Sequence, residues 1–178
     1  KLNLLKKNSV VTTVMSNLGL EKYLKNALGV KLIRTKVGDI NVITEMQKKS
    51  YTLGGEQSGH IILGNYSNTG DGILAALKIL EIMSQTKTKA SKLFDLYEQY
   101  PQIQTNLLIK KKLNGRFDQN LKKIVKKATI ANSKLRYLVR KSGTEPLIRV
   151  LIEGENKENV NSAAKKLNKE IKKIINVR

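Results

Sequence analysis

The chain has 178 residues and a formal net charge of +20, with 40% hydrophobic and 4% aromatic residues. This length allows two small domains with real cores, and the composition is that of a folded protein whose core consists mainly of Leu, Ile and Val. The absence of cysteine and the single histidine exclude disulfides, iron–sulfur clusters, thiol catalysis and multi-histidine metal sites.

The first hundred residues alternate between strand-like and helix-like patterns, which is typical of a sheet covered by helices. Strands are expected over residues 9–16, 30–35, 51–53 and 60–63. Helices are expected over residues 18–28, closed by Gly29, then after Asp39 and Asp71 as N-caps, and over residues 93–100. One apolar stripe, of Ile40, Ile43 and Met46, follows Asp39. A second stripe follows Asp71 and consists of Ile73, Ala76, Leu80 and Met83.

The pattern changes after Pro101, where a second domain is expected to start. Alternating residues predict a strand over 103–109, and two further strands are expected over 135–141 and 147–153. A helical stripe made by Leu121, Ile124, Val125 and Ala128 separates them. Asn156 starts a final helix that buries Val160, Ala164, Leu167, Ile171 and Ile174. Strands joined by a short turn pair antiparallel, so this half is expected to be a small α+β layer with both helices on one face.

The high positive charge suggests an affinity for nucleic acid, because clustered Lys and Arg attract phosphate backbones. Most of the charge, however, is lysine on the polar faces of expected helices, in the pairs Lys122 and Lys123, Lys126 and Lys127, Lys165 and Lys166, and Lys172 and Lys173. Few aromatic residues are present to stack on bases. We therefore expect no specific nucleic acid as partner, while a basic nucleic-acid-binding module remains the alternative.

No apolar run approaches the roughly 20 residues that a membrane-spanning helix needs, and no secretory signal pattern opens the chain. We therefore expect a cytoplasmic protein without a membrane partner. The chain starts at Lys1 rather than Met, inside a pattern close to that of a buried strand, which indicates a fragment.

The stretch "RKSGTEPLIR" places two arginines symmetrically around a turn. A hairpin would bring Arg140 and Arg149 face to face, and such like charges repel unless an anion lies between them. Ser142 and Thr144 add hydroxyl groups, and Gly143 allows backbone N–H groups to approach the same anion. The stretch predicts a phosphate cradle. The alternative is a plain hairpin in which Glu145 neutralises one arginine and Pro146 stiffens the turn.

The stretch "LGGEQSGHIIL" has the residue types that bind a sugar ring, since Glu56 accepts from hydroxyls and Ser58 both donates and accepts. His60 is a candidate for proton transfer near neutral pH. The alternative is a glycine-rich hairpin with a hydrogen-bonded histidine. Lys36, in "RTKVGD", is uninformative alone, and Asp71 in "TGDG" is better explained as a helix cap than as a metal ligand.

Taken together and in this order, "TKVGD", "GGEQSGH", "TGDG" and "RKSGTEPLIRV" resemble the second half of the bacterial phosphoglucosamine mutases, in the α-D-phosphohexomutase superfamily. "VMSNLGL" and "LVRKSGTEPLIRV" favour the glucosamine branch. The resemblance spans nearly the whole chain. It implies an α/β third domain with a mixed sheet and helices over residues 1–99. It also implies a small C-terminal domain over residues 100–178, with an antiparallel sheet covered by helices on one face.

The resemblance also implies an activity, the interconversion of glucosamine 6-phosphate and glucosamine 1-phosphate through a phosphoserine and a glucosamine 1,6-bisphosphate intermediate. This isomerase feeds UDP-N-acetylglucosamine and cell-wall synthesis. It implies that Glu56 and Ser58 hold ring hydroxyls, and that Lys36 and His60 contact substrate or transfer protons. The residues implied to hold the phosphate that is not transferred are Arg140, Ser142, Gly143, Thr144 and Arg149.

The family's serine loop and its Mg²⁺ loop have no counterpart in these residues, so no metal ligand is expected in this chain. Mg²⁺ and the missing N-terminal domains are expected in the full-length enzyme. Whether that enzyme forms a homodimer is left open. Ile40 stands where family members often have Arg after "VGD". The chain is therefore expected to be inactive alone. The remaining alternatives are a phosphomannomutase or phosphoglucomutase and a decayed gene product.

Overall fold

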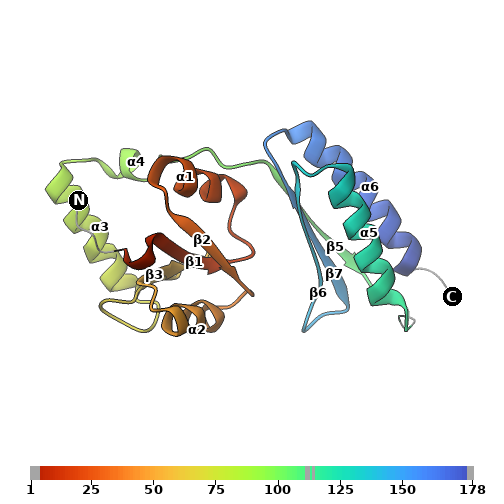
Figure 1. The fold of residues 1–178 in the computed structure, drawn as a ribbon, viewed down its shortest axis with the longest axis horizontal. Helices are drawn as coiled ribbons and strands as arrows, with labels where there is room; N and C mark the ends of the chain where they lie inside the picture. Colours follow the sequence, from red (N-terminus) through yellow and green to blue (C-terminus); the bar gives the residue numbers. More distant parts are fainter. Residues whose placement is uncertain (1–4, 111–112, 114, 176–178) are drawn as a thin grey trace. The chain divides into compact units, whose positions relative to one another are not determined.

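The computed structural model describes residues 5–110, 113 and 115–175, and the chain divides into two compact units, Lys1–Gln99 and Tyr100–Arg178 (Figure 1). The first unit holds a four-stranded sheet in the order β2-β1-β3-β4. Its strands are β1 (Ser9–Thr13), β2 (Lys31–Thr35), β3 (Leu53–Gly55) and β4 (Ile61–Leu63). β1 pairs in parallel with β2 and β3, while β3 and β4 are antiparallel. This confirms the predicted mixed sheet.

The helices of the first unit are α1 (Leu18–Leu28), α2 (Asp39–Lys49), α3 (Gly72–Thr86) and the short α4 (Ala90–Leu93). The chain crosses from β1 to β2 through α1, and back over β1 to β3 through α2. Right-handed crossovers in opposite directions place their helices on opposite faces of the sheet, as Figure 1 shows for α1 and α2. The α2 face is closed by a small core of Val11, Val42, Met46 and Ile62.

Two details around α2 differ from the prediction. Gly38, with φ of +116°, is the N-cap, and Asp39 is the first helical residue, so Asp39 as a cap was wrong. Glycine takes this left-handed conformation without strain, so Gly38 can occupy the cap position. Ile40 is 64% exposed, so the inward stripe of α2 runs through Val42 and Met46 instead.

Helix α3 begins where predicted, since the Asp71 carboxylate accepts a hydrogen bond of 2.9 Å from the Leu74 N–H. Its apolar face, however, is open to solvent. Ile73 is 77% exposed and Leu80 58%, and Leu77 between them is also exposed, while Ala75 is buried. We call Ile73, Leu77 and Leu80 the α3 apolar face.

The helix expected over residues 93–100 is absent, because α4 ends at Leu93 and the described chain continues without helical structure to Pro101. Proline disfavours helical conformation in the residue before it. The Tyr97 ring instead stacks on Tyr23 of α1, with the ring centroids 6.1 Å apart, and partial burial raises the pKa of Tyr97. Phe94 and Leu96 of this segment are exposed, so its apolar residues do not form a buried helical stripe.

The second unit is a three-stranded antiparallel sheet in the order β5-β7-β6, with β5 (Gln102–Leu108), β6 (Arg136–Lys141) and β7 (Leu147–Glu153). Helices α5 (Phe117–Ala131) and α6 (Lys157–Ile175) cover one face (Figure 1). The Asn156 side chain accepts from the Asn159 N–H, as expected of the residue before α6. The predicted α+β layer with both helices on one face is confirmed.

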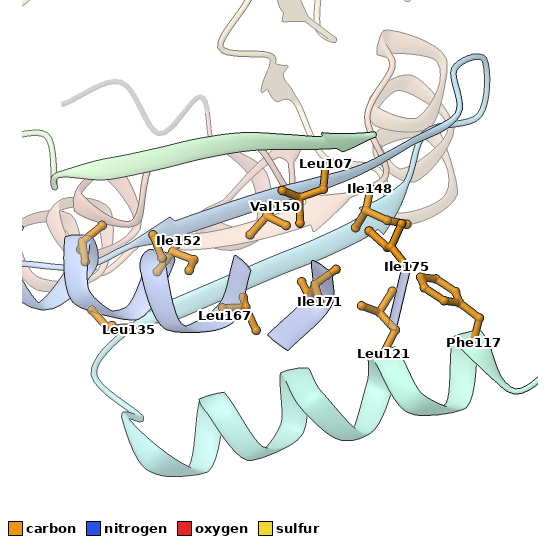
Figure 2. Close-up of a cluster of buried hydrophobic side chains, with 12 residues drawn as sticks. Leu107, Phe117, Leu121, Leu135, Ile148, Val150, Ile152, Leu167, Ile171 and Ile175 are labelled. Atoms are coloured by element: carbon orange, nitrogen blue, oxygen red, sulfur yellow. The ribbon is translucent and has the colours of Figure 1, made fainter. Parts of the chain in front are cut away.

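The core of this unit lies between the sheet and the two helices (Figure 2). Ile148, Val150 and Ile152 of β7 point into it. Since successive side chains of a strand point to opposite faces, Arg149 and Glu153 lie on the face away from the helices. The same alternation places Arg136 and Arg140 of β6 on that face, because Tyr137 and Val139 pack against the core.

Among the described residues, no helix is both long enough and apolar enough to cross a membrane.

Candidate functional site

The predicted polar loops of the first unit meet at one edge of its sheet. β1, β2 and β3 are parallel, so the segments that follow Thr13, Thr35 and Gly55 all leave the sheet at the same end. β1 and β2 are neighbours whose following helices lie on opposite faces. Ligands of open α/β sheets bind outside the carboxyl ends of such strands. Lys36, Glu56, Ser58 and His60 all lie in these segments.

Glu56 joins two of these loops. Its Oε1 accepts a hydrogen bond of 3.0 Å from the N–H of Gly38, and its side chain is only 11% exposed. Its Oε2 lies 3.7 Å from Nδ1 of His60, whose imidazole is 61% exposed. The backbone N–H of Glu56 also donates to the His60 carbonyl. The carboxylate thus fixes the "TKVGD" loop beside the "GGEQSGH" loop and keeps its second oxygen near an exposed imidazole.

Lys36 and Ser58 lie on these loops with exposed side chains. The structure brings Lys36 to the same sheet edge as Glu56 through the Gly38 contact, two residues further along the chain. Their roles toward a ligand stay predictions.

The glycines of this loop are explained by the packing and the backbone conformation of the loop itself. A Cβ on Gly54 would lie 2.3 Å from the Met46 sulfur, and one on Gly55 would lie 2.7 Å from the His60 carbonyl oxygen. These two positions are therefore required by packing inside the protein. Gly59 has φ of +102° and open space around it, so its requirement is conformational.

The loop after β1 lies at the same edge and was not predicted as part of the site. The Arg34 guanidinium donates to the Ser16 carbonyl oxygen at 2.6 Å and pairs with Glu21 at 2.9 Å, which ties this loop and α1 to β2. Sequence spacing contains no signal for this contact, because it depends on β1 and β2 being neighbours.

In the second unit, Arg140 and Arg149 lie directly opposite each other in the β6–β7 pair, as the symmetric spacing predicted. Lys141, the next residue, points to the helix side, where its ammonium lies 2.7 Å from the Asp118 carboxylate. The two arginines therefore share the face without helices, and the neighbouring cation is neutralised on the other face.

The turn between the strands is closed at both ends. The Ser142 N–H donates to the Leu147 carbonyl at 2.9 Å, and the Pro146 carbonyl accepts from Ile109, beyond β5, at 2.8 Å. Among the residues that the structure describes, the N–H groups of Gly143, Thr144 and Glu145 donate to no protein acceptor. Successive unpaired N–H groups of this kind form concave sites for anions.

Glu145 pairs with Nη2 of Arg149. One arginine is therefore neutralised, as expected for a plain hairpin. Glu145 does not complete the neutralisation, because one carboxylate faces two guanidinium groups. The Nε of Arg149 is buried without a partner, and within the described residues the Arg140 side chain makes no hydrogen bond or ion pair. The hairpin retains donors and positive charge for a further anion.

Asn106 of β5 lies beside the two arginines, which the sequence did not predict. It lies opposite Arg149 on the other side of β7, which makes a row of Asn106, Arg149 and Arg140 across the three strands. Its side chain is exposed. Only the sheet order β5-β7-β6 reveals this neighbour, since 43 positions separate it from Arg149 in the chain.

Gly143 offers a clean test of the cradle. Nothing lies within 4 Å of a Cβ added there, and its φ is not in the left-handed region, so Gly143→Ala is expected to leave the free energy of unfolding within about 0.5 kcal/mol. A phosphate held by the loop N–H groups would meet the new methyl group, so inorganic phosphate should bind more than about tenfold more weakly. Calorimetric titration and thermal denaturation measure the two effects, and unchanged phosphate affinity would contradict the cradle.

The sequence matches two family models. Residues 1–100 match the phosphoglucomutase/phosphomannomutase alpha/beta/alpha domain III, and residues 90–170 match the phosphoglucomutase/phosphomannomutase C-terminal domain. The chain belongs to the phosphoglucomutase/phosphomannomutase family. The two matched domains correspond to an α/β unit followed by a small C-terminal unit.

Curated relatives of this family member include a phosphoglucosamine mutase of Caldanaerobacter subterraneus subsp. tengcongensis, which is 46% identical over 175 residues. That match covers 97% of this chain and 39% of the relative. A phosphoglucosamine mutase of Thermodesulfovibrio yellowstonii is 48% identical over 157 residues, covering 86% of this chain and 35% of the relative. The chain thus spans little more than a third of the length of these relatives.

Among solved structures, the Aspergillus fumigatus N-acetylphosphoglucosamine mutase in complex with GlcNAc-6P and magnesium has a TM-score of 0.75 and 16% identity. The match covers 93% of this chain and 39% of that one. A Burkholderia thailandensis phosphoglucomutase/phosphomannomutase family protein has a TM-score of 0.71 and 17% identity, covering 93% of this chain and 37% of that one. At these identities the likeness establishes the phosphoglucomutase/phosphomannomutase fold.

The described residues of this family member offer no cluster of carboxylates for Mg²⁺. Among them, no group of three or more His, Asp or Glu side chains is close enough to hold a metal ion. Asp71, the acidic residue of "TGDG", is engaged in capping α3. The part of the chain that the structure describes therefore does not fit Mg²⁺ by itself.

Proposed function

We propose that this chain is the sugar- and phosphate-binding part of a phosphoglucosamine mutase, which interconverts glucosamine 6-phosphate and glucosamine 1-phosphate. The observation that carries the proposal is the pair Arg140 and Arg149, opposed on one sheet face beside unpaired loop N–H groups. Guanidinium groups bind phosphate oxygens bidentately, and an anion between them relieves their mutual repulsion. The identity of 46% to a phosphoglucosamine mutase over nearly the whole chain supports the choice of substrate.

In this proposal, the loop of Ser142, Gly143 and Thr144 holds the phosphate that is not transferred. Fixing the remote phosphate positions the reacting oxygen at the other end of the sugar, and such positioning carries much of phosphoryl-transfer catalysis. The substrate binds in both orientations in turn, because the bisphosphate intermediate must present each phosphate to the same serine. The loop therefore has to bind and release a phosphate within each turnover.

The loops of the first unit would recognise the sugar. Glu56 keeps acceptor capacity on Oε2 for ring hydroxyls, since the Gly38 N–H engages Oε1. Ser58 is exposed and offers a further donor and acceptor. His60 and Lys36 are the candidate proton carriers, and the Glu56 carboxylate lies 3.7 Å from the imidazole.

The phosphoserine, the residues that bind Mg²⁺ and the remaining active site would lie in further domains of a longer parent protein. The relatives contain more than twice the length of this chain, and the α3 apolar face offers a surface for further domains to cover. Mg²⁺ would stabilise charge on the transferred phosphoryl group there. The parent would act in the cytoplasm, on the route to UDP-N-acetylglucosamine and peptidoglycan.

Titration of the 178-residue chain with glucosamine 6-phosphate tests the proposal. We expect saturable binding, and no mutase turnover above that of a variant with Arg140→Ala and Arg149→Ala, because the phosphorylated serine is missing. Parallel titrations with glucose 6-phosphate and mannose 6-phosphate test the sugar preference, and tighter binding of either would favour another phosphohexomutase. Absence of any sugar-phosphate binding would contradict the function, and turnover by the chain would contradict its partial nature.

A further inference from the structure

The charges around the β6–β7 turn are unevenly matched. Arg140 and Arg149 face each other across the strands, and Glu145 pairs with Arg149, four residues further along the chain, alone among the described side chains. Lys141 has its own carboxylate, Asp118, on the other face of the sheet. Without a bound anion, Glu145 is therefore the carboxylate that offsets the repulsion of the two arginines.

This carboxylate occupies the place where an anion would bind. The Nη2 of Arg149 donates to Glu145, while its Nε is buried and has no partner. A phosphate that engages Arg149 with two parallel N–H donors needs Nε together with one of the Nη groups or both Nη groups together. Nη2 carries two N–H groups, so a phosphate either takes the one that Glu145 holds and displaces the carboxylate, or binds beside it against its negative charge.

We infer that Glu145 is an internal counter-anion, which holds Arg149 in place when the phosphate is absent and competes with the phosphate for it. This inference rests on the proposed function. Glu145 is a positioning residue, since it acts on the phosphate through Arg149 rather than by contact. Its side chain is 51% exposed, so after displacement it can turn into solvent at little cost.

The competition has a consequence for the reaction. A loop that must release one phosphate and accept another is impeded by very tight binding, because release then becomes slow. A carboxylate on the fourth residue before Arg149 returns to the guanidinium as the phosphate leaves. Glu145 thereby lowers the affinity for both ends of the sugar bisphosphate equally and shortens the time each one stays.

Glu145→Gln tests the inference, because it keeps the shape of the side chain and removes the charge. We expect its dissociation constants for inorganic phosphate and for glucosamine 6-phosphate to fall about two- to fivefold, with a matching slower release. Calorimetry measures the affinities of the 178-residue chain, and NMR line shapes measure the release rate. Thermal denaturation of the unliganded variant shows whether it stays folded.

Glu170→Gln is the matched control. Glu170 lies on α6 and pairs with Lys173 at 2.6 Å, and that hydrogen bond lowers the pKa of Glu170, so the substitution removes one full negative charge from an exposed ion pair. It should leave phosphate affinity unchanged. Equal increases in phosphate affinity in both variants would mean a general charge effect and would overturn the inference. Unchanged or weaker phosphate binding by Glu145→Gln would also overturn it. If the unaltered chain binds neither probe, the proposed function itself fails.

Discussion

Replacing Arg149 with alanine is expected to weaken binding of glucosamine 6-phosphate by about thirtyfold to eight-hundredfold. A bidentate guanidinium contact supplies two charge-assisted hydrogen bonds, and its loss costs roughly 2 to 4 kcal/mol. The free energy of unfolding should change by no more than about 1 kcal/mol, because the lost pair with Glu145 is exposed and the repulsion from Arg140 disappears with it. Calorimetric titration of the chain and its variant measures the loss.

The control for this variant is Lys134→Ala, which removes one positive charge beyond the opposite end of β6. It should leave sugar-phosphate binding intact. Retention of double-stranded DNA measures binding by the general positive charge, since residues 100–178 carry 20 Lys and Arg against 6 Asp and Glu. Arg149→Ala and Lys134→Ala should affect DNA retention equally and slightly, with a steep salt dependence. Equal effects of the two variants on glucosamine 6-phosphate would contradict a specific site and favour a general basic surface.

Replacing Arg136 with alanine is expected to lower the free energy of unfolding of the second unit by about 3 to 5 kcal/mol. Arg136 donates through Nε to Glu153, whose carboxylate is fully buried and whose second oxygen has no partner among the described residues. Without the arginine, a buried carboxylate would remain uncompensated. A loss of this size is a large part of the 5 to 15 kcal/mol that stabilises a typical domain.

Denaturant unfolding followed by far-ultraviolet circular dichroism measures this effect. Arg136→Lys should lose less, because it keeps the positive charge. The double variant Arg136→Met with Glu153→Leu should recover most of the stability, since a buried ion pair can be replaced by apolar side chains at little cost. A single Arg136→Ala variant as stable as the unaltered chain would show that the pair does not stabilise the unit.

Local patterns predicted those features that depend on neighbours along the chain. The opposition of Arg140 and Arg149 followed from their symmetric positions around one short turn, and the Asp71 cap followed from its place before an apolar stripe. The antiparallel layer of the second unit followed from the order of its elements. The first two of these are decided within about ten residues.

Features that depend on distant neighbours were not predictable in the same way. The row formed by Asn106 with Arg149 requires β7 to be the central strand, and the Glu56 contact with Gly38 requires β3 to follow the β1–α1–β2 unit on the other side of β1. The periodicity after Asp71 correctly indicates an apolar face but carries no information on what covers it. The segment at 93–100 has helical spacing, yet stacking of Tyr97 on Tyr23 and the following proline prevail over it.

The alternation of side chains along β6 and β7 also restricts how this protein can evolve. Arg140 and Lys141 are adjacent, yet one faces the loop site and the other closes the core over the Phe117 ring. A deletion or insertion of one residue that shifted β6 against β7 would exchange the faces of Arg140 and Lys141, and would turn Tyr137 and Val139 away from the helices at the same time. Such a length change would disturb the core together with the opposed arginines. The core therefore constrains the length of this hairpin, whereas single substitutions in its loop leave the register unchanged.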